Sequence, residues 1–118
     1  MAQRMPAEWA RHAATWIAWP HNESDWPGKL GPIRWVYGEF VRLLAARERV
    51  RILVADDAVA AEAHETLALV GAAANWDLVR VPTNRSWTRD TGPLFVERDG
   101  KKRATHWRLF PWAKYDDW

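Results

Sequence analysis

The segment NRSWTRDTGPLFVERDG, residues 84–100, places a carboxylate, Asp90, three residues after Trp87 in a stretch that leads directly into an apolar run. A carboxylate can bind a planar cation such as a guanidinium through two parallel, charge-assisted hydrogen bonds. An indole can stack on the same cation, because positive charge is attracted to the face of an aromatic ring. Trp87 and Asp90 therefore form a candidate site for a flat cationic ligand.

Both residues also have an ordinary structural interpretation. Asp90 could bond to nearby backbone groups or pair with Arg85 or Arg89, and Trp87 could be a hydrophobic plug under the loop. The residues alone leave both interpretations open. If Asp90 binds a ligand, the Thr-Gly-Pro run at 91–93 makes physical sense as a tight exit from the site. A tight turn there would fix the Asp90 side chain before the next strand begins.

The chain holds ten tryptophans, most of which we expect to pack in the core or at its rim, because each indole covers a large apolar area. Trp19 is a further candidate at the rim of a ligand channel, although a tryptophan between a strand and a proline is usually a packing residue. Asp116 is another candidate for the same channel. The alternative for the Asp116-Asp117 pair is a solvated chain end.

Length and composition indicate one soluble globular domain. The 118 residues are 48% hydrophobic and 27% charged, with no apolar run near the length of about 20 residues that crosses a bilayer. The amino-terminal stretch lacks the apolar core of a secretory signal. The chain has no cysteine, which fits a reducing compartment and removes one nucleophile. We expect a cytoplasmic protein that contacts no membrane.

The charge pattern argues against nucleic-acid binding. The formal net charge is only +2, and the densest basic cluster, RDGKKR at 98–103, has the composition of a hairpin turn. Contacts to several phosphates would need a concentrated basic face instead. We therefore expect no nucleic-acid partner.

No cofactor or metal site is predicted. The GKLG stretch lacks the glycine spacing and the strand-to-helix context of a phosphate-binding loop. The four histidines are scattered, and none is spaced to share a metal with a second ligand. We expect those in the second helix and in the hairpin to be surface or satisfied core residues. The histidines are His12, His21, His64 and His106.

The secondary-structure pattern is mixed α/β. Apolar residues recur at i, i+3 and i+4 from Ile33 to Leu44, which predicts an amphipathic helix that lies on a sheet. VRILVA is typical of a buried strand, and the Asp-Gly pair at 99–100 predicts a hairpin turn. The predicted strands are 14–20, 50–55, 76–82, 92–100 and 101–110, and the predicted helices are 33–47 and 56–72.

Four segments in order resemble the agmatine deiminase and bacterial peptidylarginine deiminase family of the guanidine-modifying pentein superfamily. They are MPAEWARHAATWIAWPHNESDWPG, WVYGEFVRLLA, WTRDTGPLFV and the terminal KYDDW. The resemblance implies an α/β fold, a five-bladed propeller of ββαβ-type units around a central channel. Residues 1–118 would be the truncated amino-terminal part of one such domain, with about one to two units.

The resemblance also implies an activity. Family enzymes hydrolyse a guanidinium group to a ureido product and ammonia through a covalent cysteine intermediate. Asp90 matches the family's guanidinium-binding aspartate, whereas the nucleophilic cysteine and the acid/base histidine would follow KYDDW. We therefore expect an inactive chain whose partner is agmatine or a peptidyl arginine. The choice between these substrates and the oligomeric state, including a homo-oligomer, stay open.

One stretch departs from the family pattern. The family commonly has a Gly-rich FNAWGGKY before YDDW, whereas this chain reads LFPWAKY at 109–115. Losing the glycine pair removes easy access to positive φ, which puts the pocket geometry in doubt there. The competing hypothesis is a non-catalytic, aromatic-rich module that binds a guanidinium or another cationic ligand.

Overall fold

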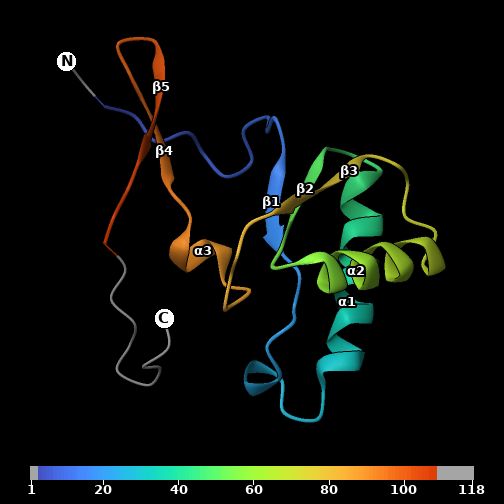
Figure 1. Ribbon diagram of the computed structural model, residues 1–118. Helices are drawn as coiled ribbons and strands as arrows, with labels where there is room; N and C mark the ends of the chain where they lie inside the picture. Colours follow the sequence, from blue (N-terminus) through green and yellow to red (C-terminus); the bar gives the residue numbers. More distant parts are fainter. Residues whose placement is uncertain (1–2, 109–118) are drawn as a thin grey trace.

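The computed structural model describes residues 3–108 and has the mixed α/β order that the sequence predicts (Figure 1). Every predicted helix and strand is present within the described residues, with ends that differ by a few positions. The elements are β1 (Thr15–Ala18), the 3₁₀ turn η1 (Glu23–Asp25), α1 (Leu30–Ala45), β2 (Val50–Val54), α2 (Asp57–Leu69), β3 (Trp76–Arg80), α3 (Thr88–Thr91), β4 (Leu94–Arg98) and β5 (Lys101–Thr105). The last part of the predicted strand 101–110 lies outside the described residues.

β1, β2 and β3 form a parallel sheet in that order, and α1 and α2 cover one face of it (Figure 1). Alternate residues of β2 are fully buried under the helices, whereas Arg51 between them is exposed. The Arg51 guanidinium carbon lies 5.1 Å from the centre of the Trp16 ring on the opposite face. The core consists of Ile17, Trp19, Val41, Ala45, Val50, Ile52, Val54, Ala63 and Leu67.

The two long helices begin and end where local chemistry allows. α1 starts three residues before the predicted position, so Pro32 lies within its first turn, where a missing N–H costs nothing. In α2 the Asp56 carboxylate caps the helix by accepting from the Val59 amide at 2.9 Å. Gly71, at a φ of 68°, ends that helix. Within residues 3–108, neither helix is long and apolar enough to cross a membrane.

The antiparallel hairpin β4–β5 stands apart from the helices, on the other side of β1 (Figure 1). Its two-residue turn is Asp99-Gly100, with φ of 55° and 70°, which confirms the predicted Asp-Gly turn. The amino-terminal segment adds a single bridge to it, because Arg4 and Glu97 exchange two backbone hydrogen bonds of 3.0 and 2.7 Å. A side-chain contact of 2.5 Å joins the same two residues.

The Arg4–Glu97 contact should respond to acid. The hydrogen bond from Arg4, and then its positive charge, lower the pKa of Glu97 below the usual glutamate range. A carboxylate with a lowered folded-state pKa stabilises the fold above its unfolded pKa, and that contribution disappears as pH falls through the folded value. We expect carbon-13 NMR titration to place Glu97 below an ordinary glutamate, and Arg4→Gln to move it back. An unchanged Glu97 titration in Arg4→Gln would contradict this.

Candidate functional site

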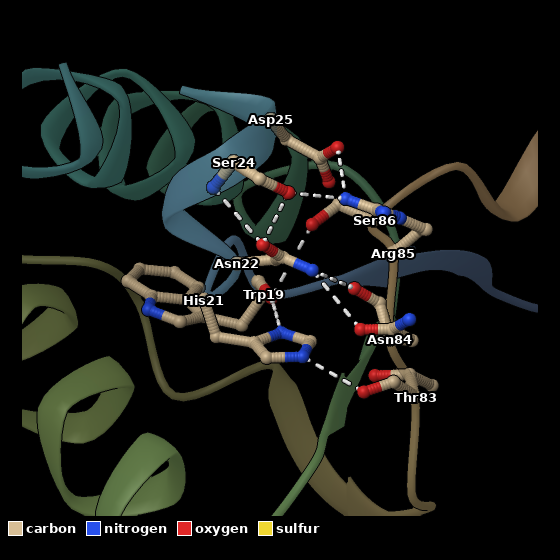
Figure 2. Close-up of polar contacts among 9 residues, drawn as sticks. All are labelled: Trp19, His21, Asn22, Ser24, Asp25, Thr83, Asn84, Arg85 and Ser86. Carbon is tan, nitrogen blue, oxygen red and sulfur yellow. Dashed lines mark hydrogen bonds and ion pairs between the residues drawn. The ribbon is translucent and has the colours of Figure 1, made fainter. Parts of the chain in front are cut away.

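Two loops lie side by side beyond the carboxyl ends of β1 and β3 (Figure 2). The first loop, residues 19–26, follows β1, and the second, residues 83–87, follows β3. In open parallel sheets, ligands bind beyond the carboxyl ends of the strands. The second loop leads directly into α3, so its position decides where the Trp87–Asp90 candidate site lies.

His21 and Asn22 join the two loops near their start. Both ring nitrogens of His21 face carbonyl oxygens, Nδ1 the Trp19 oxygen at 3.0 Å and Nε2 the Thr83 oxygen at 2.8 Å. A neutral imidazole has one N–H, so only the doubly protonated ring donates to both oxygens. The Asn22 amide nitrogen donates to the backbone and side-chain oxygens of Asn84, at 3.1 and 3.0 Å.

A buried ion pair joins the loops at the next position. Arg85 Nη1 lies 2.8 Å from Asp25 Oδ1 and 2.7 Å from Ser24 Oγ, and the Arg85 and Asp25 side chains are only 4% and 1% exposed (Figure 2). This contact answers one alternative raised by the sequence, because Arg85 pairs with Asp25 and not with Asp90. Sequence reasoning missed Asp25, whose partner lies 60 positions away and leaves no local signal.

Trp87 lies at the end of the second loop, half-buried. Its ring centre is 5.5 Å from that of Trp26 in the first loop, with the two planes tilted by 45°. Aromatic pairs in this distance range stabilise one another beyond their buried area. The contact therefore continues the series of links between the loops, and Trp87 as a residue remains partly exposed.

Asp90 lies in α3, a single helical turn at a place where the sequence predicted an open loop. The turn forms because the Asp90 and Thr91 amides both donate to the Trp87 carbonyl, at 3.1 and 3.2 Å. The Asp90 side chain is exposed, and among residues 3–108 it makes no hydrogen bond or ion pair. The neighbouring Arg89 instead pairs with Glu8. The Asp90 carboxylate is thus available to a ligand.

Gly92 makes the exit from α3 tight. Its amide donates to the Thr88 carbonyl at 2.8 Å, and a β-carbon added at Gly92 would lie 2.6 Å from that oxygen. A side chain there must push the two segments apart, although the φ of Gly92, −74°, suits any residue. The glycine is therefore required by close approach and not by backbone conformation.

We expect Gly92→Ala to open the α3 turn. The alanine methyl cannot fit at 2.6 Å from the Thr88 oxygen, so the hydrogen bond between the two residues should break. Amide hydrogen exchange should then accelerate at Asp90, Thr91 and residue 92, while the sheet amides keep their protection. Gly31→Ala is the matched control, because a β-carbon at Gly31 meets nothing within 4 Å. Equal exchange rates in both variants would contradict the argument.

The structure gives Trp19 a core position. Its side chain is 0% exposed, and its ring meets Tyr37 edge-on at 6.3 Å. A fully buried ring cannot line a channel formed by the described residues, so Trp19 packs, which was the alternative left open by the sequence. Asp116, the remaining candidate, lies outside the described residues.

Two of the hollows on the surface are formed by described residues that include neither Trp87 nor Asp90. One, of about 480 Å³, lies between residues 9–13 and 47–49. The other, of about 510 Å³, lies between the amino-terminal segment, the open face of the sheet and β4. Asp90 itself is exposed. Within residues 3–108, no group of three or more His, Asp or Glu side chains could hold a metal ion.

The sequence matches the family described as Porphyromonas-type peptidyl-arginine deiminase over residues 4–118. It is 33% identical to an agmatine deiminase of Ectopseudomonas mendocina over 113 residues, which are 95% of this chain and 29% of that protein. It is 32% identical to an agmatine deiminase of Stutzerimonas stutzeri, over 97% of this chain and 31% of that protein. The chain thus spans about a third of the length of these relatives.

Solved structures agree with these relatives. An X-ray structure of a putative agmatine deiminase superposes with a TM-score of 0.77 at 25% identity, over 89% of this chain and 29% of that one. The agmatine deiminase of C. jejuni superposes with a TM-score of 0.72 at 22% identity, over 87% and 30%. The second likeness is evidence for the fold alone. Taken with the match over residues 4–118, they confirm the resemblance in the sequence, and the chain belongs to the Porphyromonas-type peptidyl-arginine deiminase family.

Proposed function

We propose that this chain supplies a guanidinium-binding segment of a deiminase acting on agmatine or a related guanidinium compound. The observation that carries the proposal is the Asp90 carboxylate, which is exposed, unpaired among residues 3–108 and held on a one-turn helix three residues after the partly exposed Trp87. Relatives at about a third identity are named agmatine deiminases, which supports a guanidinium as the ligand.

In this proposal Asp90 binds and does not react. Its two oxygens accept from two parallel N–H groups of the guanidinium, while the Trp87 ring covers one face of the cation. Deimination forms a bond from a nucleophile to the guanidinium carbon, releases ammonia and then uses water to give the ureido product. The chain contains no cysteine, so the family's nucleophile is not among its residues. Its contribution is therefore to orient the substrate.

The exposure of Asp90 sets the expected strength of binding. An ion pair in open solvent contributes at most about 1 kcal/mol, and stacking on an exposed ring adds about 0.5–1 kcal/mol. Agmatine should therefore bind this chain with a Kd on the order of 10 mM or weaker. Tight binding in the intact enzyme would need the pair to be enclosed. We propose that these residues are the amino-terminal part of a pentein-type propeller whose channel provides that enclosure.

The experiment is an agmatine titration of the nitrogen-15-labelled chain. We expect shifts confined to the Trp87 indole and to the amides of residues 88–92, without saturation at low millimolar concentrations. A diamine of similar length carries a primary ammonium and cannot form the two parallel bonds, so it should cause much smaller shifts. Asp90→Asn should abolish the agmatine-specific shifts, while Asp99→Asn in the hairpin turn should leave them unchanged.

Three outcomes would change the conclusion. Shifts scattered over the surface, or equal shifts in wild type and Asp90→Asn, would rule out a guanidinium site at Asp90. Saturable micromolar binding would instead favour a free-standing binding module, the second hypothesis that the tryptophan-rich sequence raises. A module of that kind would need no further chain to enclose its ligand.

A further inference from the structure

We propose that the buried Asp25–Arg85 ion pair is a positioning device that holds Trp87 and α3 in register for guanidinium binding. This inference rests on the proposed function and extends it to residues that never touch the ligand. The pair joins the loop after β1 to the loop after β3 (Figure 2). Arg85 lies two residues before Trp87 in the sequence.

The first observation is that successive residues of the first loop contact successive residues of the second loop. Asn22 bonds to Asn84, Ser24 and Asp25 bond to Arg85, and the Trp26 ring contacts the Trp87 ring. Links at successive positions fix the second loop along its length and not at one point. A loop held in this way can move only if several contacts break together, so the start of α3 has a defined position. The pairs, in order, are Asn22–Asn84, Ser24–Arg85, Asp25–Arg85 and Trp26–Trp87.

The second observation is that the network is poorly optimised for stability. Among residues 3–108, Asp25 Oδ2 and Trp26 Nε1 are buried without a hydrogen-bond partner. A buried ion pair is seldom more stable than a well-packed apolar pair of the same volume, and unpaired buried atoms add to its cost. The Asp25–Arg85 pair therefore contributes little net stability. We infer that its role is to fix the relative position of the two loops.

The third observation is that burial decreases along residues 85–90. Arg85 and Ser86 are buried, Trp87 is half-buried, and Asp90 is exposed. The segment is thus anchored at its start and open to a ligand at its end. α3 is one turn long and is closed by the Gly92 hydrogen bond. A displacement of the Arg85 backbone should therefore displace Asp90 by a similar amount.

The test compares Asp25→Asn with Asp77→Asn in the 118-residue chain. Asp25→Asn keeps the shape and removes the negative charge, so the Arg85 guanidinium donates to a neutral amide oxygen and the attraction between opposite charges is lost. Asp77 is the control, because it pairs with Arg49 through two hydrogen bonds on the exposed side of β3. We expect only Asp25→Asn to weaken the nuclear Overhauser effects between the Trp26 and Trp87 rings, about fivefold.

Agmatine is the second readout, since a merely structural role for the pair would not change it. The agmatine-induced shift at the Asp90 amide should fall about fivefold in Asp25→Asn and stay unchanged in Asp77→Asn. If Asp25→Asn does not fold, the double variant Asp25→Leu with Arg85→Met replaces it, because it removes both charges of the pair and leaves neither one buried alone.

The outcomes separate this inference from the proposed function. Unchanged ring contacts in a folded variant, or weakened ring contacts with an unchanged agmatine shift, overturn the positioning role. If agmatine leaves wild-type Asp90 unshifted, the proposed function fails, and the ring contacts alone decide whether the pair places Trp87. Weakening of both readouts in Asp25→Asn, with Asp77→Asn unchanged, supports the inference.

Discussion

Trp19→Ala is expected to lower the free energy of unfolding by about 3–5 kcal/mol, the usual range when a large buried aromatic is truncated in a core. Trp19 is fully buried and packs edge-on against Tyr37 of α1. Its backbone amide also donates to the Leu53 carbonyl of β2 at 2.9 Å, so the residue lies where β1, β2 and α1 meet. Alanine would leave a cavity that this junction cannot close.

Urea unfolding measured by far-ultraviolet circular dichroism tests the Trp19 prediction. Trp9→Ala is the matched control, because Trp9 is 90% exposed and its removal should change the free energy by less than about 0.5 kcal/mol. Similar losses in the two variants would mean that Trp19 is not in the core. A domain of ordinary stability has about 5–15 kcal/mol, so the loss at Trp19 should be large enough to shift the midpoint clearly.

Arg85→Met should also destabilise the fold by about 3–5 kcal/mol, because it leaves the Asp25 carboxylate buried without its cation. The Asp25 side chain is only 1% exposed, so water cannot replace the lost contact. Methionine keeps much of the arginine's apolar length, and the loss should therefore come from the charge and not from packing.

A double-mutant cycle tests the Arg85 prediction. Adding Asp25→Leu to Arg85→Met removes the orphaned charge and should recover most of the lost stability. Arg89→Met is the exposed control. The Arg89–Glu8 pair has side chains that are 83% and 66% exposed, so its loss should cost less than about 1 kcal/mol. If the double variant is no more stable than Arg85→Met, the buried charge is not the cause.

The sequence predicts the elements well wherever a local pattern defines them. The Asp-Gly turn at 99–100 and the strand expected from VRILVA depend on neighbouring residues, and both are confirmed. The helical turn at Asp90 was missed, because four residues carry too little periodicity to distinguish a turn of helix from a loop. The parallel order of β1, β2 and β3 was also not predicted, since strand order depends on contacts far apart in the chain.

In the candidate site, too, features set by neighbouring residues could be predicted, and features set by distant contacts could not. Trp87 and Asp90 are found from one short segment, whereas the Asp25–Arg85 pair that anchors this segment joins positions that only the fold brings together. At Trp19 the local sequence is present but does not decide the position of the side chain. A tryptophan between a strand and a proline fits either a core or a rim, and only the packing of α1 against the sheet decides between them.

The parallel sheet has a consequence for how the chain assembles. β1 pairs with β2 although α1 separates them in the sequence, and β2 pairs with β3 although α2 separates them. In contrast, β4 and β5 are consecutive along the chain. Closing long segments slows folding, and hairpins form in microseconds. We therefore expect pulse-labelled hydrogen exchange to protect β4 and β5 first. The two loops that hold Asp25 and Arg85 can meet only late, after the strands that carry them have paired.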